Sequence, residues 1–310
     1  MISVSNLKRD FGKQVVVDDL SFEVKPGDVV GFLGPNGAGK STTMKMLTGF
    51  LTPSSGAIKI AGQDIKTHTK AIQQKIGYLP EGAPAYGDMT VYQFLKFITQ
   101  VRKIPKARAQ QRIAYVSEQV ALNEVMDTSI DTLSKGFKRR VGLAQAIIHD
   151  PDILILDEPT DGLDPNQKHQ VRKLIKNLSK DKIVIISTHI LEEVTAVCNR
   201  AIIIAQGKLK FDGTPEELQK RSAYHNAVTI KLSYLSDISG LLEIDGVIDI
   251  KHNKETQRVT IFPEPGKTIL SQVSAHVQEV KLPVDMIFPE QGRLDDVFRE
   301  ITQTSQGEVL

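Results

Sequence analysis

The residues with the clearest chemical potential form a glycine-rich stretch near the N-terminus. Residues 34–42 read Gly-Pro-Asn-Gly-Ala-Gly-Lys-Ser-Thr, which fits the phosphate-loop pattern G-x-x-x-x-G-K-[ST]. Glycines let the backbone wrap closely around an anion, and the N–H groups of the loop and of the following helix then face its phosphates. In such a loop Lys40 would reach the β- and γ-phosphates of a nucleotide, and the Ser41 hydroxyl would bind magnesium.

The sequence predicts that the whole loop forms one nucleotide-binding site. Its residues are Gly34, Pro35, Asn36, Gly37, Ala38, Gly39, Lys40, Ser41 and Thr42.

Two adjacent carboxylates form the second candidate site. Asp157 and Glu158 directly follow the apolar run 153–156, which reads as a buried strand. Ligands of open α/β sheets bind at the carboxyl ends of the strands. Asp157 would hold magnesium, often through water, and Glu158 would polarise the water that attacks the γ-phosphate. This division of roles suits phosphoryl transfer, which depends on positioning and charge stabilisation. Either motif alone could be an ordinary turn, but together they favour nucleotide hydrolysis.

The elements around these motifs predict a parallel sheet. The apolar run 29–33 precedes the phosphate loop as a strand, and a helix begins near Thr42. Apolar runs and helical patterns alternate up to about residue 220, as in sheets with crossover helices. The further expected elements are an antiparallel pair at 2–8 and 14–24, an inserted helical subdomain at about 90–148, strands at 152–157, 182–187 and 200–205, and helices at 166–178 and 190–198.

A second, smaller domain is predicted at the C-terminal end. The chain has 310 residues, enough for about two domains. Residues 224–310 hold eight Lys and Arg against thirteen Asp and Glu, whereas the whole chain has a net charge of +2. We therefore expect domains at 1–223 and 224–310. The second reads as βαββαβ, the ferredoxin-like order, with strands at 227–232, 247–251, 258–262 and 284–288, helices at 235–243 and 267–279, and a last helix at 293–303.

The sequence contains no sign of a membrane span or of nucleic-acid binding. The longest apolar runs, such as 201–205, fall far short of the ~20 residues that cross a bilayer. The N-terminus has no apolar signal core, and Cys198 is the only cysteine, so a cytosolic protein is expected. The basic cluster Lys138-Arg139-Arg140 is interpreted as a solvated helix face. No nucleic-acid partner is expected.

With these motifs in place, residues 1 to about 220 resemble the ATP-binding subunits of ABC transporters. Leu133-Ser134-Lys135-Gly136-Phe137 stands where that family has its signature. Ser134 and Gly136 match the signature, whereas Lys135 and Phe137 depart from the usual glycine and glutamine. Three further positions also match the family: Phe11 as the aromatic residue at adenine, Asp164 in the loop that follows the Asp157 strand, and His189 as the switch histidine.

The resemblance implies a fold and a set of cofactors. The fold would be an α/β P-loop NTPase, with a RecA-like parallel sheet, an N-terminal antiparallel β subdomain and an inserted helical subdomain, followed by the small ferredoxin-like α+β domain. The cofactors would be ATP and Mg²⁺. Phe11 would stack on adenine, and His189 would contact the γ-phosphate and hold Glu158 and the water in place. Read singly, Phe11 is an ordinary aromatic residue and His189 a helix cap.

The resemblance also implies a head-to-tail dimer. ATP on residues 34–42 of one subunit would be closed over by Ser134 and Gly136 of the other, with the positive end of the helix that starts near Ser134 aimed at the γ-phosphate. Asp164 would communicate across the interface. Read singly, Ser134 is a plain helix N-cap.

One matched segment departs from the family pattern. Residues 77–81 align with the Q-loop, but Glu81 stands in place of glutamine. A carboxylate there could still bind magnesium, directly or through water. Residues 82–103 would receive the permease. Glu81, the altered signature and the added tail, including 292–298, together most resemble the type 2 exporter subfamily, and within it the gliding-motility-type ATPase subunits.

The expected function is therefore that of the ATP-hydrolysing subunit of an ABC exporter. It would work with integral membrane permease subunits on a separate chain, as a homodimer or as a heterodimer with a paralogue. It would be cytoplasmic and peripheral at the inner face of the cell membrane. One alternative is a soluble ABC ATPase acting on ribosomes or DNA, which would usually carry two ATPase units, coiled coils or basic arms. A GTPase or small-molecule kinase leaves the motif at 133–137 unexplained.

Overall fold

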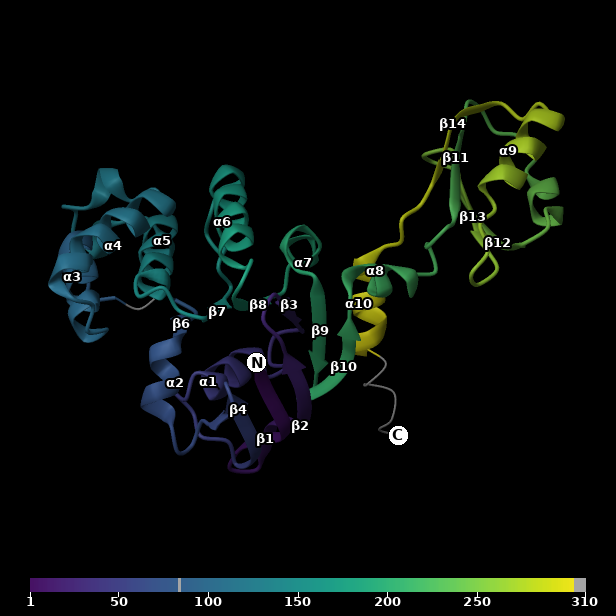
Figure 1. Cartoon of the computed structure of the whole chain (residues 1–310). Helices are drawn as coiled ribbons and strands as arrows, with labels where there is room; N and C mark the ends of the chain where they lie inside the picture. Colours follow the sequence, from purple (N-terminus) through teal and green to yellow (C-terminus); the bar gives the residue numbers. More distant parts are fainter. Residues whose placement is uncertain (83–84, 304–310) are drawn as a thin grey trace. The chain divides into compact units, whose positions relative to one another are not determined.

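The computed structural model describes residues 1–82 and 85–303. Residues Met1–Pro215 make up most of one compact unit, and Glu216–Ile301 make up the other. The contacts thus divide between Pro215 and Glu216, whereas the sequence predicts a domain boundary near residue 223, which stays a prediction. Each unit is described separately below (Figure 1).

A six-stranded sheet forms the centre of the first unit. Its strand order is β10-β9-β3-β8-β7-β6, with all neighbouring pairs parallel except β9 and β10. Strands β3, β6, β7 and β8 are buried along their whole length, as expected for parallel strands covered by helices on both faces. The bounds are β3 (Val29–Leu33), β6 (Ile76–Leu79), β7 (Ile153–Asp157), β8 (Ile183–Thr188), β9 (Arg200–Ala205) and β10 (Lys208–Gly213). The predicted parallel sheet is confirmed, with β6 and β10 as additional strands.

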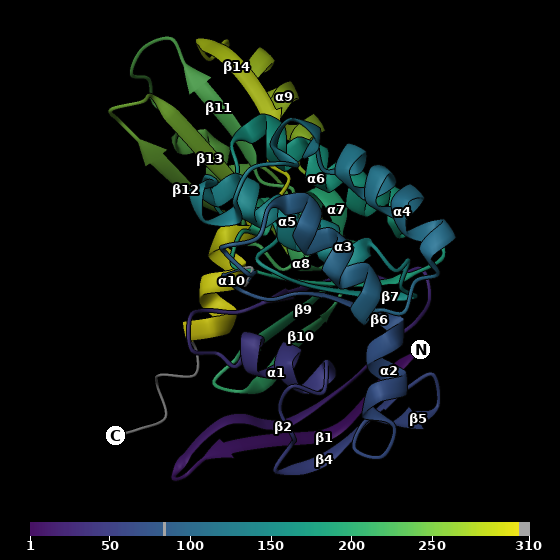
Figure 2. The same cartoon turned by 90° about the vertical axis from the view of Figure 1, so that its left-hand side faces the viewer.

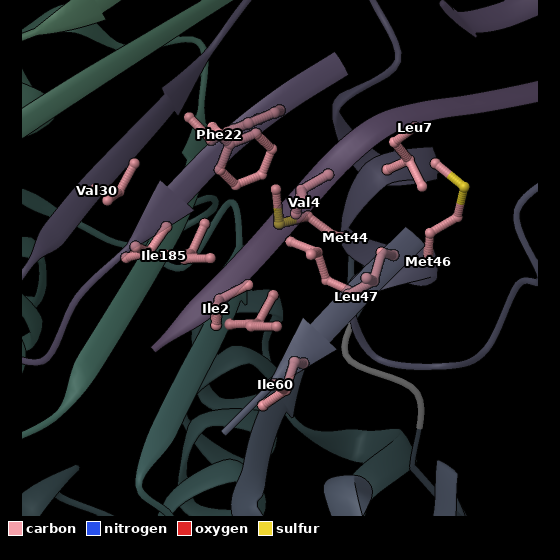
Figure 3. Packing of buried hydrophobic residues seen from close by; sticks show 14 of the residues in the cluster. Ile2, Val4, Leu7, Phe22, Val30, Met44, Met46, Leu47, Ile60 and Ile185 are labelled. Atoms are coloured by element: carbon pink, nitrogen blue, oxygen red, sulfur yellow. The ribbon is translucent and has the colours of Figure 1, made fainter. Parts of the chain in front are cut away.

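Helix α1 (Lys40–Leu47) contacts β7 and β8 of the six-stranded sheet on one side. On its other side it packs against an antiparallel sheet of order β2-β1-β4-β5. The antiparallel sheet contains β1 (Ile2–Phe11), β2 (Gln14–Val24), β4 (Ser55–Ile60) and β5 (Gln63–Asp64). Figure 3 shows side chains of β1, such as Val4, meeting Met44 and Leu47 of α1 in the core. The predicted antiparallel pair is confirmed. Helix α1 is therefore held between two sheets, and this fixes the end from which the phosphate loop extends.

Helices fill the segment that the sequence predicts to be a helical subdomain. Figures 1 and 2 show α3 (Val91–Val101), α4 (Lys106–Gln119) and α5 (Lys135–Ile147) grouped together, with α5 also contacting β6. Outside this segment the first unit also contains α2 (Thr69–Lys75), α6 (Pro165–Leu178) and α7 (Leu191–Val197). Helix α8 (Pro215–Lys220) begins at the last residue before the division between the two units. Within residues 1–82 and 85–303, no helix has the length and apolar character needed to cross a bilayer.

The second unit is built on a four-stranded antiparallel sheet of order β12-β13-β11-β14. Its apolar core lies between the sheet and α9, with Val228, Ile261 and Val273 fully buried. The elements are β11 (Val228–Leu232), β12 (Val247–Asn253), β13 (Arg258–Pro263), α9 (Leu270–Glu279), β14 (Val284–Pro289) and α10 (Leu294–Gln303). Four of the strands and the last two helices match the predicted segments closely.

The helix predicted over residues 235–243 is wrong as an α-helix. Only Ser239–Glu243 is helical, as a 3₁₀ turn. The Asp237 carboxylate accepts a hydrogen bond from the Ser239 backbone at 3.0 Å, and the Leu241 N–H bonds to the Ile238 carbonyl three residues back. An Asp that captures a nearby backbone N–H offers the chain an alternative to the α-helix. The local hydrogen bonds therefore determine the conformation of this segment, although its apolar spacing favours an α-helix.

The burial of the central sheet of the first unit can be tested by substitution. Ile185 lies in β8 with no exposed surface (Figure 3). Ile185→Ala should lower the free energy of unfolding by about 2–5 kcal/mol, because it removes buried methyl groups and leaves a cavity. Val15→Ala, at a 46 % exposed position of β2, should change it by less than about 0.5 kcal/mol. Urea unfolding followed by circular dichroism measures both, and equal losses would contradict the assigned core.

Candidate functional site

The phosphate loop is shaped by two close backbone approaches. A Cβ atom on Gly34 would lie 2.5 Å from the Ile204 carbonyl oxygen of β9, and one on Gly39 would lie 2.7 Å from the Val16 carbonyl oxygen of β2. Gly39 also has φ +101°, in the region that favours glycine. Both positions therefore require glycine. The tip, residues 35–37, is exposed, so the loop is anchored at its base and open where an anion would enter.

Lys40 is the buried cation of this loop. Its ammonium donates hydrogen bonds to the carbonyls of Gly34 at 2.7 Å and of Pro35 at 3.1 Å, and the residue is 8 % exposed. Burial lowers the pKa of Lys40, and the carboxylates of Glu158, Asp157 and Glu81 oppose that shift. The structure therefore brings the predicted lysine and all three predicted carboxylates into one electrostatic cluster. Ser41 and Thr42 follow it in the first turn of α1.

Asp157 carries an oxygen that needs a partner. It ends β7, is 1 % exposed, and its buried Oδ2 accepts no hydrogen bond within the described part of the chain. A buried carboxylate oxygen without a donor is costly, so a cation or a cation-bound water fits here. Among the described residues no three His, Cys, Asp or Glu side chains gather into a metal site of their own. A magnesium ion would therefore depend on the Ser41 hydroxyl, Asp157, Glu81 and the phosphates themselves.

Glu158 and His189 are brought together directly. The Nδ1 atom of His189 lies 2.9 Å from Oε1 of Glu158, and the Glu158 N–H bonds to the Ser187 carbonyl at 2.8 Å. Burial raises the pKa of Glu158, while the hydrogen bond and charge of His189 and the charge of Lys40 oppose that shift. Glu158 has φ +51°, an uncommon conformation for a residue with a side chain. The turn after β7 thus aims a partly desolvated carboxylate at the carboxyl edge of the sheet, where a water could be polarised.

A buried glutamate that the sequence analysis missed supports this edge. Glu193 of α7 accepts hydrogen bonds from the hydroxyls of Thr160 and Thr188, and it is 4 % exposed. It thereby joins the loop after Glu158 to the strand end before His189. The sequence held a signal, since Glu193 lies four residues before the buried Val197 and so on the same helix face, whereas its neighbour Glu192 is exposed.

The signature residues lie at the start of α5. Ser134 is the N-cap, and its hydroxyl accepts a hydrogen bond from the Phe137 N–H at 3.3 Å. Gly136 is buried against the loop before α6, where a Cβ would lie 3.2 Å from the Gly162 carbonyl oxygen. Asp164 caps α6 by accepting the Gln167 N–H at 2.9 Å. In the described part of the chain, no hydrogen bond or ion pair joins these three residues to the phosphate loop of the same chain.

Phe11 ends β1 and stays largely uncovered. Its ring is 48 % exposed, with the Arg9 guanidinium 4.6 Å from the ring centroid. Phe11 pairs with Gln14 at the start of β2, the strand whose Val16 carbonyl closes on Gly39. With Arg9 over one face, the exposed remainder of the ring could stack on a flat ligand, and contact with adenine stays a prediction.

The interpretation of 138–140 as a solvated face is wrong for its two arginines. Arg139 and Arg140 are only 5 % and 6 % exposed, because α5 packs against β6 on one side and against α3 and α4 on the other. Their guanidinium groups donate to backbone carbonyls, Arg139 to Pro80 at 2.8 Å and Arg140 to Ala121 at 2.7 Å. The sequence held a signal here too, since Arg139 and Arg140 share a face of α5 with the buried Leu143.

Comparison with known proteins agrees with this site. The family profile for ABC transporters matches residues 17–161. The ATP-binding protein YxlF of Bacillus subtilis (strain 168) is 36 % identical over 87 % of this chain and 90 % of its own length. The linearmycin resistance ATP-binding protein LnrL of the same organism is 36 % identical over 91 % of this chain and 96 % of its own. The Nod factor export ATP-binding protein I of Ralstonia nicotianae is 31 % identical over 97 % and 94 %.

A solved structure of an ATP-binding subunit of an ABC transporter shares the fold, with a TM-score of 0.67 and 28 % identity over 71 % of this chain and 92 % of that one. The profile match includes the phosphate loop and the Asp157–Glu158 strand end. The fold is therefore that of a P-loop NTPase, and the activity is ATP hydrolysis with ATP and Mg²⁺. The chain belongs to the ABC transporter family, as one of its ATP-binding subunits.

Proposed function

We propose that this chain hydrolyses ATP for an exporter, as half of a head-to-tail dimer bound to integral membrane permease subunits on separate chains. The observation that carries the catalytic part is the hydrogen bond of Glu158 to His189, one residue beyond the unpartnered Asp157 oxygen. The relatives named for Nod factor export and linearmycin resistance support export. By the same reasoning the protein works as a peripheral protein at the cytoplasmic face of the membrane.

The residues divide the work of phosphoryl transfer. Lys40 leaves the carbonyls of Gly34 and Pro35 and turns to the β- and γ-phosphates, where an ammonium gains more from a dianion than from neutral oxygens. Glu158 takes the proton of the attacking water, and burial raises the pKa of Glu158, which makes its carboxylate a stronger base than that of an exposed glutamate. His189 fixes the Glu158 carboxylate and reaches the γ-phosphate. Ser41, Asp157 and Glu81 would hold magnesium, which would supply charge neutralisation at the phosphates.

The second subunit completes each site. Ser134 and Asp164 are exposed, and Ser134 lies at the N-terminal end of a 13-residue helix. That end carries partial positive charge, which suits a phosphate of the partner's nucleotide. Gly136, packed on Gly162, ties the signature to the loop that ends at Asp164. One chain thus offers the two motifs as a single surface, which would close over ATP bound to residues 34–42 of the other chain.

The permease would dock on the loop before α3 and on the exposed side of that helix. Tyr86 is 58 % exposed and Tyr92 is 39 % exposed. Residues 83–84 of the predicted docking segment 82–103 lie outside the described residues. Gly87 is bound closely to residues that precede the signature, since its carbonyl accepts hydrogen bonds from the Ser129 hydroxyl and the Asp131 N–H. A displacement of this loop by the permease would therefore be transmitted to Ser134 through these hydrogen bonds and the few residues between Asp131 and Ser134.

Removing the base tests the catalytic assignment. Glu158→Gln should bind ATP normally, because the shape is kept, and should lose about 10²–10⁴-fold in turnover, because an amide cannot take the proton. The variant should also accumulate as an ATP-bound dimer. Phosphate release and size-exclusion chromatography measure the two effects. Glu192→Gln, the same change at an exposed site of α7, is the control. Normal turnover of Glu158→Gln would remove Glu158 from its role.

The same variant identifies the partner. Tagged Glu158→Gln protein, captured from detergent-solubilised cells in ATP, should carry a polytopic membrane protein in near-equal amount. Ribosomal or DNA-repair proteins without any permease would instead establish a soluble ABC ATPase.

Removing the loop cation tests the phosphate site. Lys40→Ala should weaken ATP binding by about 10–100-fold, since a hydrogen bond to a charged group contributes about 1.5–3 kcal/mol. Titration with a fluorescent ATP analogue measures it. Lys45→Ala removes an exposed lysine from the same helix and should leave the affinity as it is. If both variants bound ATP like the parent, the phosphate-loop assignment would be wrong.

A charge on the docking surface tests the permease contact. Tyr92→Glu should reduce permease binding and permease-stimulated ATPase activity, because a carboxylate would be buried without a partner. Tyr115→Glu is a matched control, since Tyr115 is also a 39 % exposed tyrosine of the helical region. Co-purification and stimulated ATPase rates decide the matter. Equal behaviour of the two variants would place the docking surface elsewhere.

A further inference from the structure

Arg139 binds two residues that lie 78 positions apart in the sequence, Pro80 and Glu158. From α5 its Nη1 donates to the carbonyl of Pro80 at 2.8 Å, and its Nη2 donates to the carbonyl of Glu158. Pro80 ends the segment that leads from β6 into Glu81. The Arg139 side chain is buried, and both bonds are partly buried. One guanidinium therefore holds the backbone on either side of the nucleotide edge of the sheet.

The Glu158 backbone needs such support. Its φ of +51° lies in the left-handed region, which is strained for a residue with a Cβ. Residues in such conformations persist only where the surroundings fix them. Here the Glu158 N–H is fixed by the Ser187 carbonyl, and the Glu158 carbonyl is fixed by Arg139. The direction of the Glu158 carboxylate follows from these two bonds, together with the bond from His189.

Arg139 also faces a concentration of negative charge. The carboxylates of Asp157, Asp161, Glu158 and Glu81 all act on its guanidinium. Glu81 adds a charge where the family pattern has a neutral glutamine, so a second buried cation besides Lys40 has a clear electrostatic reason. Arginine keeps its charge when buried and presents its donors in a fixed fork.

The neighbouring arginine shows what a purely structural role looks like. Arg140 has the same burial and also donates to two carbonyls, those of Val120 and Ala121 at the end of α4. Its guanidinium lies 4.0 Å from the Phe137 ring centroid. All of these partners belong to the helical region, and none belongs to the catalytic turn. Arg140 is thus a control that matches Arg139 in residue type, helix and burial.

We propose that Arg139 is a positioning residue for ATP hydrolysis, which sets the Glu158 carboxylate through the Glu158 carbonyl and links it to the loop that carries Glu81. The proposal rests on the proposed role of Glu158 as the base. It gives the segment next to the docking surface a direct mechanical route to the base, through Pro80, Arg139 and Glu158.

The test compares Arg139→Gln, Arg139→Lys and Arg140→Gln in the full-length protein. Arg139→Gln should lower kcat about 100-fold, as expected when a catalytic group is misplaced by about 1 Å, with ATP affinity within about threefold of the parent. Arg139→Lys should recover part of kcat, because an ammonium keeps the charge and reaches one of the two carbonyls. Arg140→Gln should lower Tm with kcat nearly unchanged. ATPase kinetics, nucleotide titration and thermal melts give the three readouts.

Three outcomes would overturn the proposal. In the first, Arg139→Gln and Arg140→Gln lose kcat equally at equal Tm. In the second, Arg139→Gln raises KM and leaves kcat unchanged. In the third, Arg139→Lys restores nothing although it melts like the parent. If Arg139→Gln does not fold, Arg139→Lys is compared with Arg140→Lys instead. A loss of kcat confined to Arg139→Lys supports the proposal, and equal kcat values overturn it. Failure of the underlying function is distinguishable, because Glu158→Gln would then turn over normally.

A double-mutant cycle tests the link to Glu81. Glu81→Gln removes the extra charge, so Arg139→Gln should cost at least about threefold less in kcat in that background than in the parent. Additive losses would overturn the electrostatic part of the proposal.

Discussion

The site depends on the parallel register of the central sheet. Leu33 is level with Thr188 across β3 and β8, and Asp157 is level with Ser187 across β7 and β8. Because parallel strands end at the same edge, the residues that follow them leave the sheet together. The phosphate loop, Glu158 and His189 are these residues. A shift of β7 by one residue would also exchange the two faces of the strand and turn Asp157 away from its site.

Local chemistry made much of this edge predictable. The phosphate loop is contiguous, and Asp157 and Glu158 follow an apolar run, so their neighbours in space are their neighbours in sequence. The strands on either side were predicted for the same reason. The strands β4, β5, β6 and β10 were not predicted. Strands β5 and β6 have two and four residues, too few for a clear alternation, whereas β4 and β10 have six residues each and were missed despite their length.

The buried charges were the hardest to predict, because their partners are distant backbone atoms. Arg139 and Arg140 look like a solvated cluster in a sequence, yet the carbonyls that they bind come from segments 59 and 19 residues away. Glu193 is hidden in the same way, since its hydrogen-bond donors are Thr160 and Thr188. In both cases helical spacing placed the charge on an apolar face. That conflict between pattern and polarity was the available signal, and two of the three residues that it marks, Arg139 and Glu193, hold the segment around Glu158.

Helix α5 therefore positions two residues with different roles. Ser134 at its N-cap is exposed, and in the proposed dimer it contacts the nucleotide of the partner subunit. Arg139 lies five residues further on, about 7.5 Å along the axis, and bonds to the catalytic turn of its own chain. A rigid helix moves the two residues together. Closing of α5 on the partner's ATP would thus be felt at Glu158 of the same chain, and each subunit's base would respond to the nucleotide bound by the other.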